Sequence, residues 1–451
     1  MIEIQPSVRT HKLSGRDFDL IAASAAGPGT IAVLARAELS KHLLLLRTVM
    51  AVGADRFPSA YSAAGLDSGF QLLTDVQRTD PTTAAQVIGL PHFGAWAFRC
   101  LSGFHRDSDD RERAAELGRL NALAALAAIR SGLEARLRVP VRNGALALPT
   151  LGALHLPGPA WAELRHTPGV GTFALPPGRA GIRLPIGEGS GGNGRWSPVA
   201  RLRNPPGSVP VEVLVDDVDP ALGTTYRRGR PGGEEPDRRW RTHFAPAWRL
   251  LSRHHGERAR ALAAALHTVV PLAARPTGRT SGTAPSAFGA VAMSPPGDAA
   301  SFAEALVHEF QHVVLGALND MMPFTERDSG ARYYAPWRPD ARPVDGLLHG
   351  CYAYIGVTEF WRRVRAHVSA RHRAHVEFAR WRSAVERTLD ALEEAEALNE
   401  AGVRLVRGMR ASTEAWRSER VPRAAQRDAD TLNADHRLTW LTSRPAEARP
   451  R

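Results

Sequence analysis

The spacing of apolar residues predicts helices near both ends of the chain and short strands between them. Residues 31–52 place apolar side chains at helical spacing with few helix breakers, and a second helix is expected over 90–101. Residues 112–137 are rich in Ala, Leu and Arg, which predicts a long helix at the surface. From 139 to 218, short Val, Leu and Ile runs alternate with Pro- and Gly-rich turns, a pattern typical of strands.

Three short polar segments interrupt this β-rich section. The Asn-Gly pair at 143–144 predicts a hairpin turn. The aspartates within 216–219 could bind a cation, but an acidic turn at a strand end is favoured by turn chemistry. The Gly-rich stretch at 187–193 is not followed by Lys-Ser or Lys-Thr, so no phosphate-binding loop is expected there.

The second half of the chain returns to helical spacing. Helices are expected over 240–272 and over about 344–365, with an extended segment at 287–293 before the central motif described below. A charged helical segment follows and runs to about 410. The last forty residues are polar and arginine-rich, and their end is expected to be loosely ordered.

The expected fold class is therefore α+β and mostly helical, with a β-rich middle section. Four consecutive regions are expected. They are an N-terminal helical region at 1–138, a β-rich region at 139–230, a catalytic region at 240–410 and a polar, arginine-rich tail at 411–451.

Composition indicates a soluble globular protein. The 451 residues are 43% hydrophobic and 23% charged, which is ordinary for a chain that buries a core. No apolar run approaches the length of a membrane span, and the N-terminal residues do not have the pattern of a signal peptide. The two cysteines, Cys100 and Cys351, provide no disulfide framework, which fits a cytoplasmic protein.

The formal net charge of +12 is almost entirely due to arginine, because Lys12 and Lys41 are the only lysines. A nucleic-acid-binding surface would require basic residues gathered in one patch with interleaved aromatics. Here the arginines are spread along the chain, beside Ala, Glu or Asp, so nucleic-acid binding is not expected. A docking surface for an acidic peptide remains open.

The most informative stretch is SFAEALVHEFQHVVLGALND, which contains His-Glu-x-x-His at His308, Glu309 and His312. On a helix, residues i and i+4 share one face, so both imidazoles can reach one metal ion. Glu309 lies about 100° round the helix from His308, close enough to act on a metal-bound water. Asp298 and Ser301 are suitable N-caps for this helix.

A catalytic metal site needs a third protein ligand. The next expected helix, GLLHGCYAYIGVTEFWRR, has one narrow stripe that contains His349, Tyr352, Gly356 and Glu359. Glu359 is favoured, because two histidines and one carboxylate suit both hydrolytic zinc and non-haem iron sites. His349 is the rival ligand. The expected architecture is zincin-like, with the HExxH helix packed against this second ligand-bearing helix. The alternative role for Glu359 is an ion pair with Arg362 or Arg363.

The loop YYAPWRPDARP lies between these two helices in the sequence. It carries Arg338 and Arg342, whose planar guanidinium groups could bind the carboxylate of a co-substrate or peptide bidentately. Two solvated loop arginines are the equal alternative. The same loop carries Tyr334 and Trp337.

Over these residues the chain resembles the HExxH-motif peptide-modification proteins of actinobacterial ribosomal-peptide (RiPP) clusters, the αKG-HExxH non-haem iron enzyme family. The resemblance rests on AFGAVAMSPPGDAASFAEALVHEFQHVVLGALND and YYAPWRPDARPVDGLLHGCYAYIGVTEFWRR. GAWAFRCL and VLVDDVDP contribute more weakly. The block around the HExxH motif is specific, whereas the match nearer the N-terminus, from KLSGRDFDLIA onward, is loose.

This resemblance implies an Fe(II)/2-oxoglutarate-dependent oxygenase that hydroxylates a β-carbon in a ribosomally made precursor peptide. Some members are fused to, or encoded beside, radical-SAM enzymes, which implies such a partner here. The implied ligands, two histidines and a carboxylate, map onto His308, His312 and Glu359. Relatives often carry glutamine where His349 stands and histidine where Tyr354 stands, which weakens His349 as a ligand.

Two enzyme hypotheses follow. In the oxygenase, Arg338 or Arg342 would bind the distal carboxylate of 2-oxoglutarate, and Glu309 would orient a bound ligand or water. In a zinc metallopeptidase, Glu309 would take a proton from zinc-bound water, and Tyr334 or Tyr352 would steady the oxyanion. A metal-stabilised peptide-binding module is disfavoured, because structural zinc normally has four protein ligands, often cysteines.

Overall fold

The computed structural model describes residues 11–186, 194–219, 222, 234–273, 280–326 and 330–442. The Gly-rich stretch at 187–193 and the end of the expected tail, 443–451, lie outside the described residues. Helices and strands combine in an α+β fold in which helix predominates, which confirms the expected fold class. Among the described residues, no helix is both long and apolar enough to cross a membrane.

The chain forms two compact units, and each is assembled from segments that are not consecutive. The first, which we call the HExxH unit, comprises 1–37, 247–264 and 303–451. The second, the strand unit, comprises 38–246 and 265–302. The four consecutive regions expected from the sequence therefore do not coincide with these units, because segments from both ends of the chain fold with the HExxH helix.

The helices of the strand unit come mainly from the N-terminal third of the chain. They are the second half of α2 (Pro28–Arg56), then α3 (Pro58–Ala64), α4 (Leu66–Thr79), α5 (Pro81–Ile88), α6 (Pro91–Gly103), α7 (Asp110–Leu117) and α8 (Arg119–Ser131). Helices α2 and α6 confirm the expected helices over 31–52 and 90–101.

The expected long surface helix over 112–137 is wrong in two respects. It is divided at Gly118, and Gly132, at φ 68°, ends α8 in the left-handed conformation. Moreover, α8 is buried over 119–128. Its alanines are small enough on every face to let α4, α5 and the following strands pack closely around it.

The middle of the chain folds into short strands, as expected. Within the described residues they form three sheets: an antiparallel sheet β1 (Ala135–Pro140), β4 (Trp161–Thr167), β5 (Gly171–Leu175), β6 (Ile182–Leu184); a second antiparallel sheet β2 (Ala145–Leu148), β3 (Gly152–His155), β7 (Trp196–Pro198); and a mixed sheet β11 (Ser281–Gly282), β12 (Ala290–Met293), β10 (Thr268–Pro271), β9 (Glu212–Val215), β8 (Ala200–Arg203). Asn143 and Gly144 turn the chain before β2 with φ of 52° and 71°, as the Asn-Gly pair predicts.

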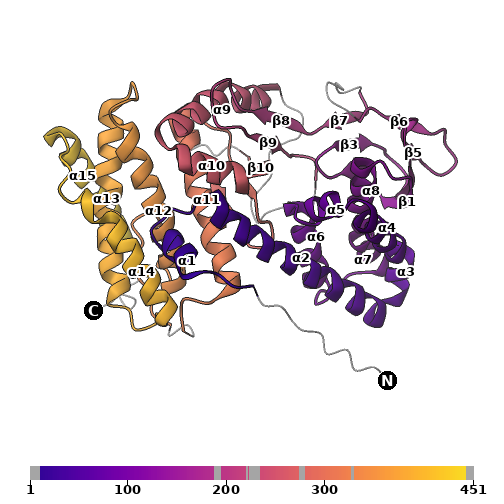
Figure 1. Ribbon diagram of the computed structural model, residues 1–451, viewed down its shortest axis with the longest axis horizontal. Helices are drawn as coiled ribbons and strands as arrows, with labels where there is room; N and C mark the ends of the chain where they lie inside the picture. Colours follow the sequence, from indigo (N-terminus) through magenta and orange to yellow (C-terminus); the bar gives the residue numbers. More distant parts are fainter. Residues whose placement is uncertain are drawn as a thin grey trace. The chain divides into compact units, whose positions relative to one another are not determined.

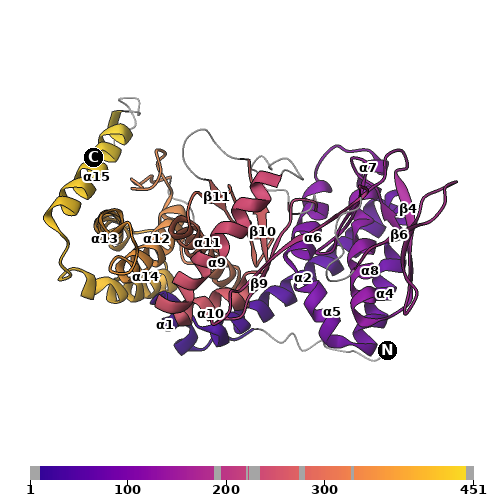
Figure 2. The same cartoon turned by 90° about the horizontal axis from the view of Figure 1, so that it is seen from above.

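The HExxH unit is built from helices. They are α1 (Gly15–Ala22), the end of α9 (Glu234–His254), α10 (Gly256–Ala265), α11 (Ala299–Met321), α12 (Val344–Val364), α13 (Arg371–Glu393), α14 (Glu400–Thr413), the short η2 (Glu414–Trp416) and α15 (Arg423–Thr442). Figures 1 and 2 show α12, α13 and α14 side by side, with α15 along α13.

The described part of the arginine-rich tail ends in a helix. Residues 423–442 form α15, which packs on α13 and buries Ala425, Ala429, Asn433 and Trp440. Three of these positions are four residues apart, so a narrow stripe of the polar helix faces α13. The end of the tail, to which the expectation of loose order applied, lies outside the described residues.

Helix α11 carries the motif, and α12 packs directly against it. Asp298 caps α11, since its Oδ1 accepts the Ser301 N–H at 2.8 Å. At the crossing point, a Cβ on Gly356 of α12 would lie 2.7 Å from Cγ of Gln311 and 3.2 Å from Cγ1 of Val307. The absence of a side chain at Gly356 thus lets the second helix approach the first closely.

Candidate metal centre on the HExxH helix

His308 and His312 lie one turn apart on α11, and their side chains converge. Their Nε2 atoms are 3.1 Å apart, and their rings meet edge to face with centroids 4.7 Å apart. Two nitrogens that each lie about 2.0–2.1 Å from one ion are separated by roughly 3.0–3.4 Å. The pair therefore fits a single metal ion, as the motif predicts.

Both histidines are in the form that binds a metal. Burial lowers the pKa of His308 to about 4. Burial, and then the neighbouring His308 and His349, lower the pKa of His312 well below its usual value. Both imidazoles are therefore neutral at pH 7, as a metal ligand must be. The His308 side chain keeps 22% of its surface exposed, so an ion can reach it.

Glu309 lies beside the histidine pair. The residue is only 1% exposed, and its Oε1 lies 3.9 Å from Nε2 of His308. A carboxylate at that distance can accept a hydrogen bond from a water or ligand held by the histidines. It can equally take a proton from such a water. The geometry therefore supports both roles considered for this residue.

Helix α12 brings two further side chains to the pair. The ring of His349 is nearly parallel to that of His312, with centroids 6.4 Å apart. The ring of Tyr354 meets His308 edge to face at 5.1 Å. Sequence reasoning singled out His349 but gave Tyr354 no role. The available signal was the resemblance, which marks position 354 as one where relatives carry histidine.

Tyr354 lies between two tryptophans. Its ring stacks on Trp337 from the loop, with centroids 4.9 Å apart. It also contacts Trp381 from α13 at a tilt of 42°, with centroids 4.2 Å apart. Burial, followed by the charge of Glu304, raises the pKa of the Tyr354 phenol. Its hydroxyl therefore remains protonated at neutral pH and can donate a hydrogen bond. Trp337 in turn packs against Gly350, where a Cβ would lie 2.3 Å from its ring.

Glu359, the favoured third ligand, is bound elsewhere. Its carboxylate accepts hydrogen bonds from Nε of Arg362 at 2.6 Å and Nε of Arg363 at 2.5 Å. Burial alone would raise the pKa of Glu359, but these two arginines hold it below its usual value. Glu359 also follows His349 by ten residues, which is about 15 Å along a helix. The structure thus shows the alternative, an ion pair, in place of the expected metal contact.

Of the two candidate third ligands, only His349 lies beside His312. Its Nε2 is 3.8 Å from Oδ1 of Asp345, one turn earlier on α12. Within the described ranges, however, no three His, Cys, Asp or Glu side chains are placed so that they could hold a metal ion together. The residues therefore fit a metal at two positions, His308 and His312, and the third ligand is not assigned.

The two tyrosines proposed to steady an oxyanion also have other partners. Tyr352 is fully buried, and its hydroxyl donates to the carbonyl of Ile21 at 2.8 Å. The Tyr334 hydroxyl is 2.8 Å from Nδ1 of His436 on α15. Neither hydroxyl is directed to the histidine pair, because each is held by a different element of the unit. Tyr354 replaces them as the tyrosine beside the motif.

The loop arginines share one carboxylate. Nε of Arg338 donates to Oδ1 of Asp340 at 2.8 Å, and Nη1 of Arg342 donates to Oδ2 of the same residue at 3.3 Å. Trp337, the residue before Arg338, packs on Tyr354. This loop therefore reaches the neighbourhood of the histidines, and a co-substrate carboxylate bound there would replace Asp340 as the partner of the arginines.

The strand unit contains a second polar cluster, built around the acidic turn expected at 216–219. Nε2 of His92 lies 2.8 Å from Oδ2 of Asp216, and neither side chain is exposed. Oδ1 of Asp216 accepts the backbone N–H groups of Val218 and Asp219 at 3.0 and 2.9 Å. Asp216 thus forms the expected turn, and the same carboxylate holds Nε2 of His92 near the start of α6.

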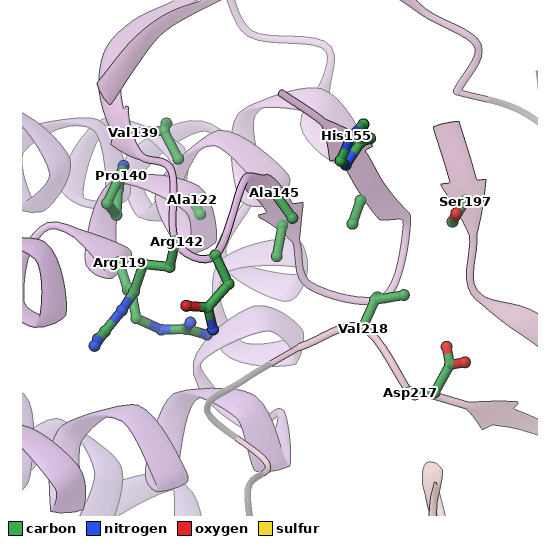
Figure 3. A pocket seen from close by; sticks show the side chains of 13 residues that line it. Arg119, Ala122, Val139, Pro140, Arg142, Ala145, His155, Ser197, Asp217 and Val218 are labelled. Atoms are coloured by element: carbon green, nitrogen blue, oxygen red, sulfur yellow. The ribbon is translucent and has the colours of Figure 1, made fainter. Parts of the chain in front are cut away.

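A cavity of 430 Å³ lies beside this cluster, within the strand unit. Its floor consists of small side chains from the second sheet: Ala145, Ala147, Ala153 and Ser197. Figure 3 shows Arg119 and Arg142 on one side of it and Ser197 and Asp217 on the other. Arg119 pairs with Asp219, and Arg142 pairs with Glu116.

Searches of protein-family models and of curated proteins give no match to this chain. The function is therefore argued from the geometry of the site and from the resemblance of its motifs. A fold alone would not carry that argument, because one fold hosts many activities.

Proposed function

We propose that this protein is a mononuclear metalloenzyme that acts on a peptide, with the metal held by His308 and His312. The supporting observation is the 3.1 Å approach of their two neutral Nε2 atoms on one face of α11. We further propose, on the resemblance of the motifs, an Fe(II)/2-oxoglutarate-dependent oxygenase that hydroxylates a β-carbon in a ribosomally made precursor peptide. A radical-SAM enzyme is the proposed partner in the same maturation.

Bound Fe(II), with 2-oxoglutarate and O₂, would supply the oxidising chemistry, and the protein would supply position and exclusion of water. His308 and His312 would hold the ion, with His349 the nearest further imidazole. Glu309 would accept a hydrogen bond from a bound water, and the protonated hydroxyl of Tyr354 would donate one. Arg338 or Arg342 would bind the distal carboxylate in exchange for Asp340.

The aromatic side chains around Tyr354 would limit the access of water. Trp337 and Trp381 cover its two sides, at centroid distances of 4.9 and 4.2 Å. An apolar wall beside a polar centre strengthens the electrostatic interactions within it. A zincin-like packing of the motif helix on α12 is part of this proposal.

A second candidate, a zinc metallopeptidase that cleaves a precursor peptide, is favoured by one observation. Oε1 of Glu309 lies 3.9 Å from Nε2 of His308, beside the position of a metal-bound water. In that enzyme Glu309 would take the proton of the water. The two candidates share both histidines and differ in the metal and in the dependence on 2-oxoglutarate.

The test is an anaerobic titration of metal-free protein with Fe(II) and 2-oxoglutarate. The oxygenase is expected to give a visible charge-transfer band, and succinate once air is admitted. His312→Ala should lose both signals. His372→Ala is the matched control, because His372 is an exposed histidine of the same unit that pairs with Asp428.

Other results of this titration would contradict the oxygenase. Tight retention of zinc, with neither a band nor succinate, would overturn the oxygenase. Peptide cleavage that is lost in Glu309→Gln would then identify the metallopeptidase. If His308→Ala and His312→Ala both keep full activity, the metal centre itself is wrong.

A further inference from the structure

The HExxH unit contains a cavity that the proposed reaction does not use. It has a volume of 680 Å³ and is bordered by the segment after α1, the junction of α9 and α10, and parts of α12 and of the α14–η2 region. Five arginines line it: Arg253, Arg258, Arg260, Arg362 and Arg363. A volume of this size matches that of small-molecule sites, which run to several hundred Å³.

The carboxylates of the cavity do not balance these arginines. Glu257 and Glu359 are the acidic residues among its lining. Glu257 pairs with Arg260, and Glu359 pairs with both Arg362 and Arg363. Glu419, outside the lining, also pairs with Arg362, so Arg253 and Arg258 are the two lining arginines without an ion pair among the described residues. Arg253 is exposed, and neither a hydrogen bond nor an ion pair of its side chain is found in the part of the chain that the structure describes.

Arg258 is the most informative of the five. Its guanidinium donates to three neutral oxygens: Oε1 of Gln311 at 2.8 Å, the carbonyl of Ser24 at 2.7 Å and Oγ of Ser24 at 3.2 Å. Among the described residues no carboxylate is in ion-pair contact with it. A partly buried cation without a contacting counter-charge is costly, and proteins normally supply a partner.

The start of α10 adds to the positive potential that the arginines create in the cavity. Gly256 and Glu257, at the N-terminus of this ten-residue helix, line the same cavity. The first backbone N–H groups of a helix and its dipole favour a nearby negative charge. Arg253, Arg258 and the helix start therefore all favour a negative charge in the same cavity.

We infer that this cavity binds a small organic or inorganic anion with carboxylate or phosphate groups, held by Arg258 and Arg253 at the start of α10. A guanidinium forms two parallel hydrogen bonds to either group, so carboxylate and phosphate share the recognition chemistry. The site is independent of the metal centre proposed above, since His308 and His312 are absent from its lining.

The experiment is calorimetric titration of metal-free protein at low ionic strength with two probes, citrate and inorganic phosphate. Sodium chloride of matched ionic strength is the blank. We expect saturable binding of at least one probe, weakened roughly ten- to hundredfold in Arg258→Met and in Arg253→Gln. Arg249→Gln, an exposed α9 arginine outside the cavity, should bind as the parent protein does.

Binding of citrate but not phosphate would identify a carboxylate ligand, and the reverse a phosphate ligand. Arg253 is exposed, so Arg253→Gln should fold. This variant therefore tests the site even if Arg258→Met is unstable. Heat no greater than the chloride blank, or binding unchanged in Arg253→Gln and a folded Arg258→Met, would overturn the site. His312→Ala should leave anion binding intact. Failure of the anion site can therefore be distinguished from failure of the proposed metal centre.

Discussion

The two units each contain buried polar groups, with different kinds of partner. In the strand unit two of them pair with carboxylates of the same unit: His92 with Asp216, and Arg119 with Asp219. In the HExxH unit two neutral imidazoles, His308 and His312, face each other, and Arg258 contacts only neutral oxygens.

If the proposed metal centre and anion site are right, this difference separates polar groups that hold a fold together from polar groups that bind an external partner. Breaking a buried pair leaves an uncompensated charge, so the strand unit should be sensitive to such changes. Groups prepared for a metal or an anion gain their main interaction only on binding. Substitutions of His308, His312 or Arg258 should therefore change binding far more than the free energy of unfolding. The following predictions run from the largest expected effect on that free energy to the smallest.

Asp216→Ala should lower the free energy of unfolding most, by about 3–5 kcal/mol. It removes the partner of His92 and leaves the N–H groups of Val218 and Asp219 without their acceptor. Denaturant unfolding measures this change. Asp55→Ala, at an exposed site on α2, is the control and should stay within about 0.5 kcal/mol of the parent. An equally small change in both variants would remove the contrast between the units.

Stability should fall in mild acid because of His42. This residue is fully buried, its Nδ1 lies 2.7 Å from the carbonyl of Ile88, and burial, with a smaller contribution from Lys41, lowers its pKa to about 4. The unfolded chain has the ordinary value of about 6.5 and so binds the proton first. The stabilisation is therefore complete above pH 6.5 and is lost as the pH falls towards 4, by about 3 kcal/mol.

The measurement for His42 is the free energy of unfolding against pH in the parent and in His42→Gln. The variant should show a shallower decline between pH 6.5 and pH 4, because it lacks the group that takes up the proton. Parallel curves for the two proteins would show that His42 does not contribute.

Gly356→Ala should cost about 1–3 kcal/mol. The added Cβ would lie 2.7 Å from Cγ of Gln311, whose amide is already held by Ser24 and Arg258. Gly316→Ala on α11 is the matched control, because a Cβ there meets nothing within 4 Å. That change should stabilise the helix by up to about 1 kcal/mol. Thermal unfolding of the pair checks the sign of each, and equal shifts would contradict the close packing of α12 on α11.

His312→Ala should have the smallest effect on metal-free stability, within about 1 kcal/mol, because the side chain is half-buried and its ring partner is neutral. Fe(II) or Zn²⁺ should raise the melting temperature of the parent protein, and the same variant should lose that rise. Melting curves with and without each metal provide the measurement. A metal-dependent rise that survives in His312→Ala would place the ion elsewhere.

Local sequence determined much of this architecture. The HExxH spacing places His308 and His312 on one face of a helix whatever surrounds it, because residues four apart on a helix lie one above the other. Apolar periodicity likewise located α2, α6 and α12, and the alternation of short apolar runs with turns located the β-rich section. The turn at 216–219 followed from the local hydrogen bonding of aspartate.

The tertiary structure alone decided which of these faces meet. The same helical stripe contains His349 and Glu359, but only His349 lies beside His312, because the length of α12 separates the two residues. The stripe that α15 buries on α13 and the burial of α8 over 119–128 depend on neighbours far away in sequence. Arg258 is the clearest case, since its partners Ser24 and Gln311 are distant along the chain. Helical periodicity fixes which residues share a face, whereas the packing of distant segments fixes what that face contacts.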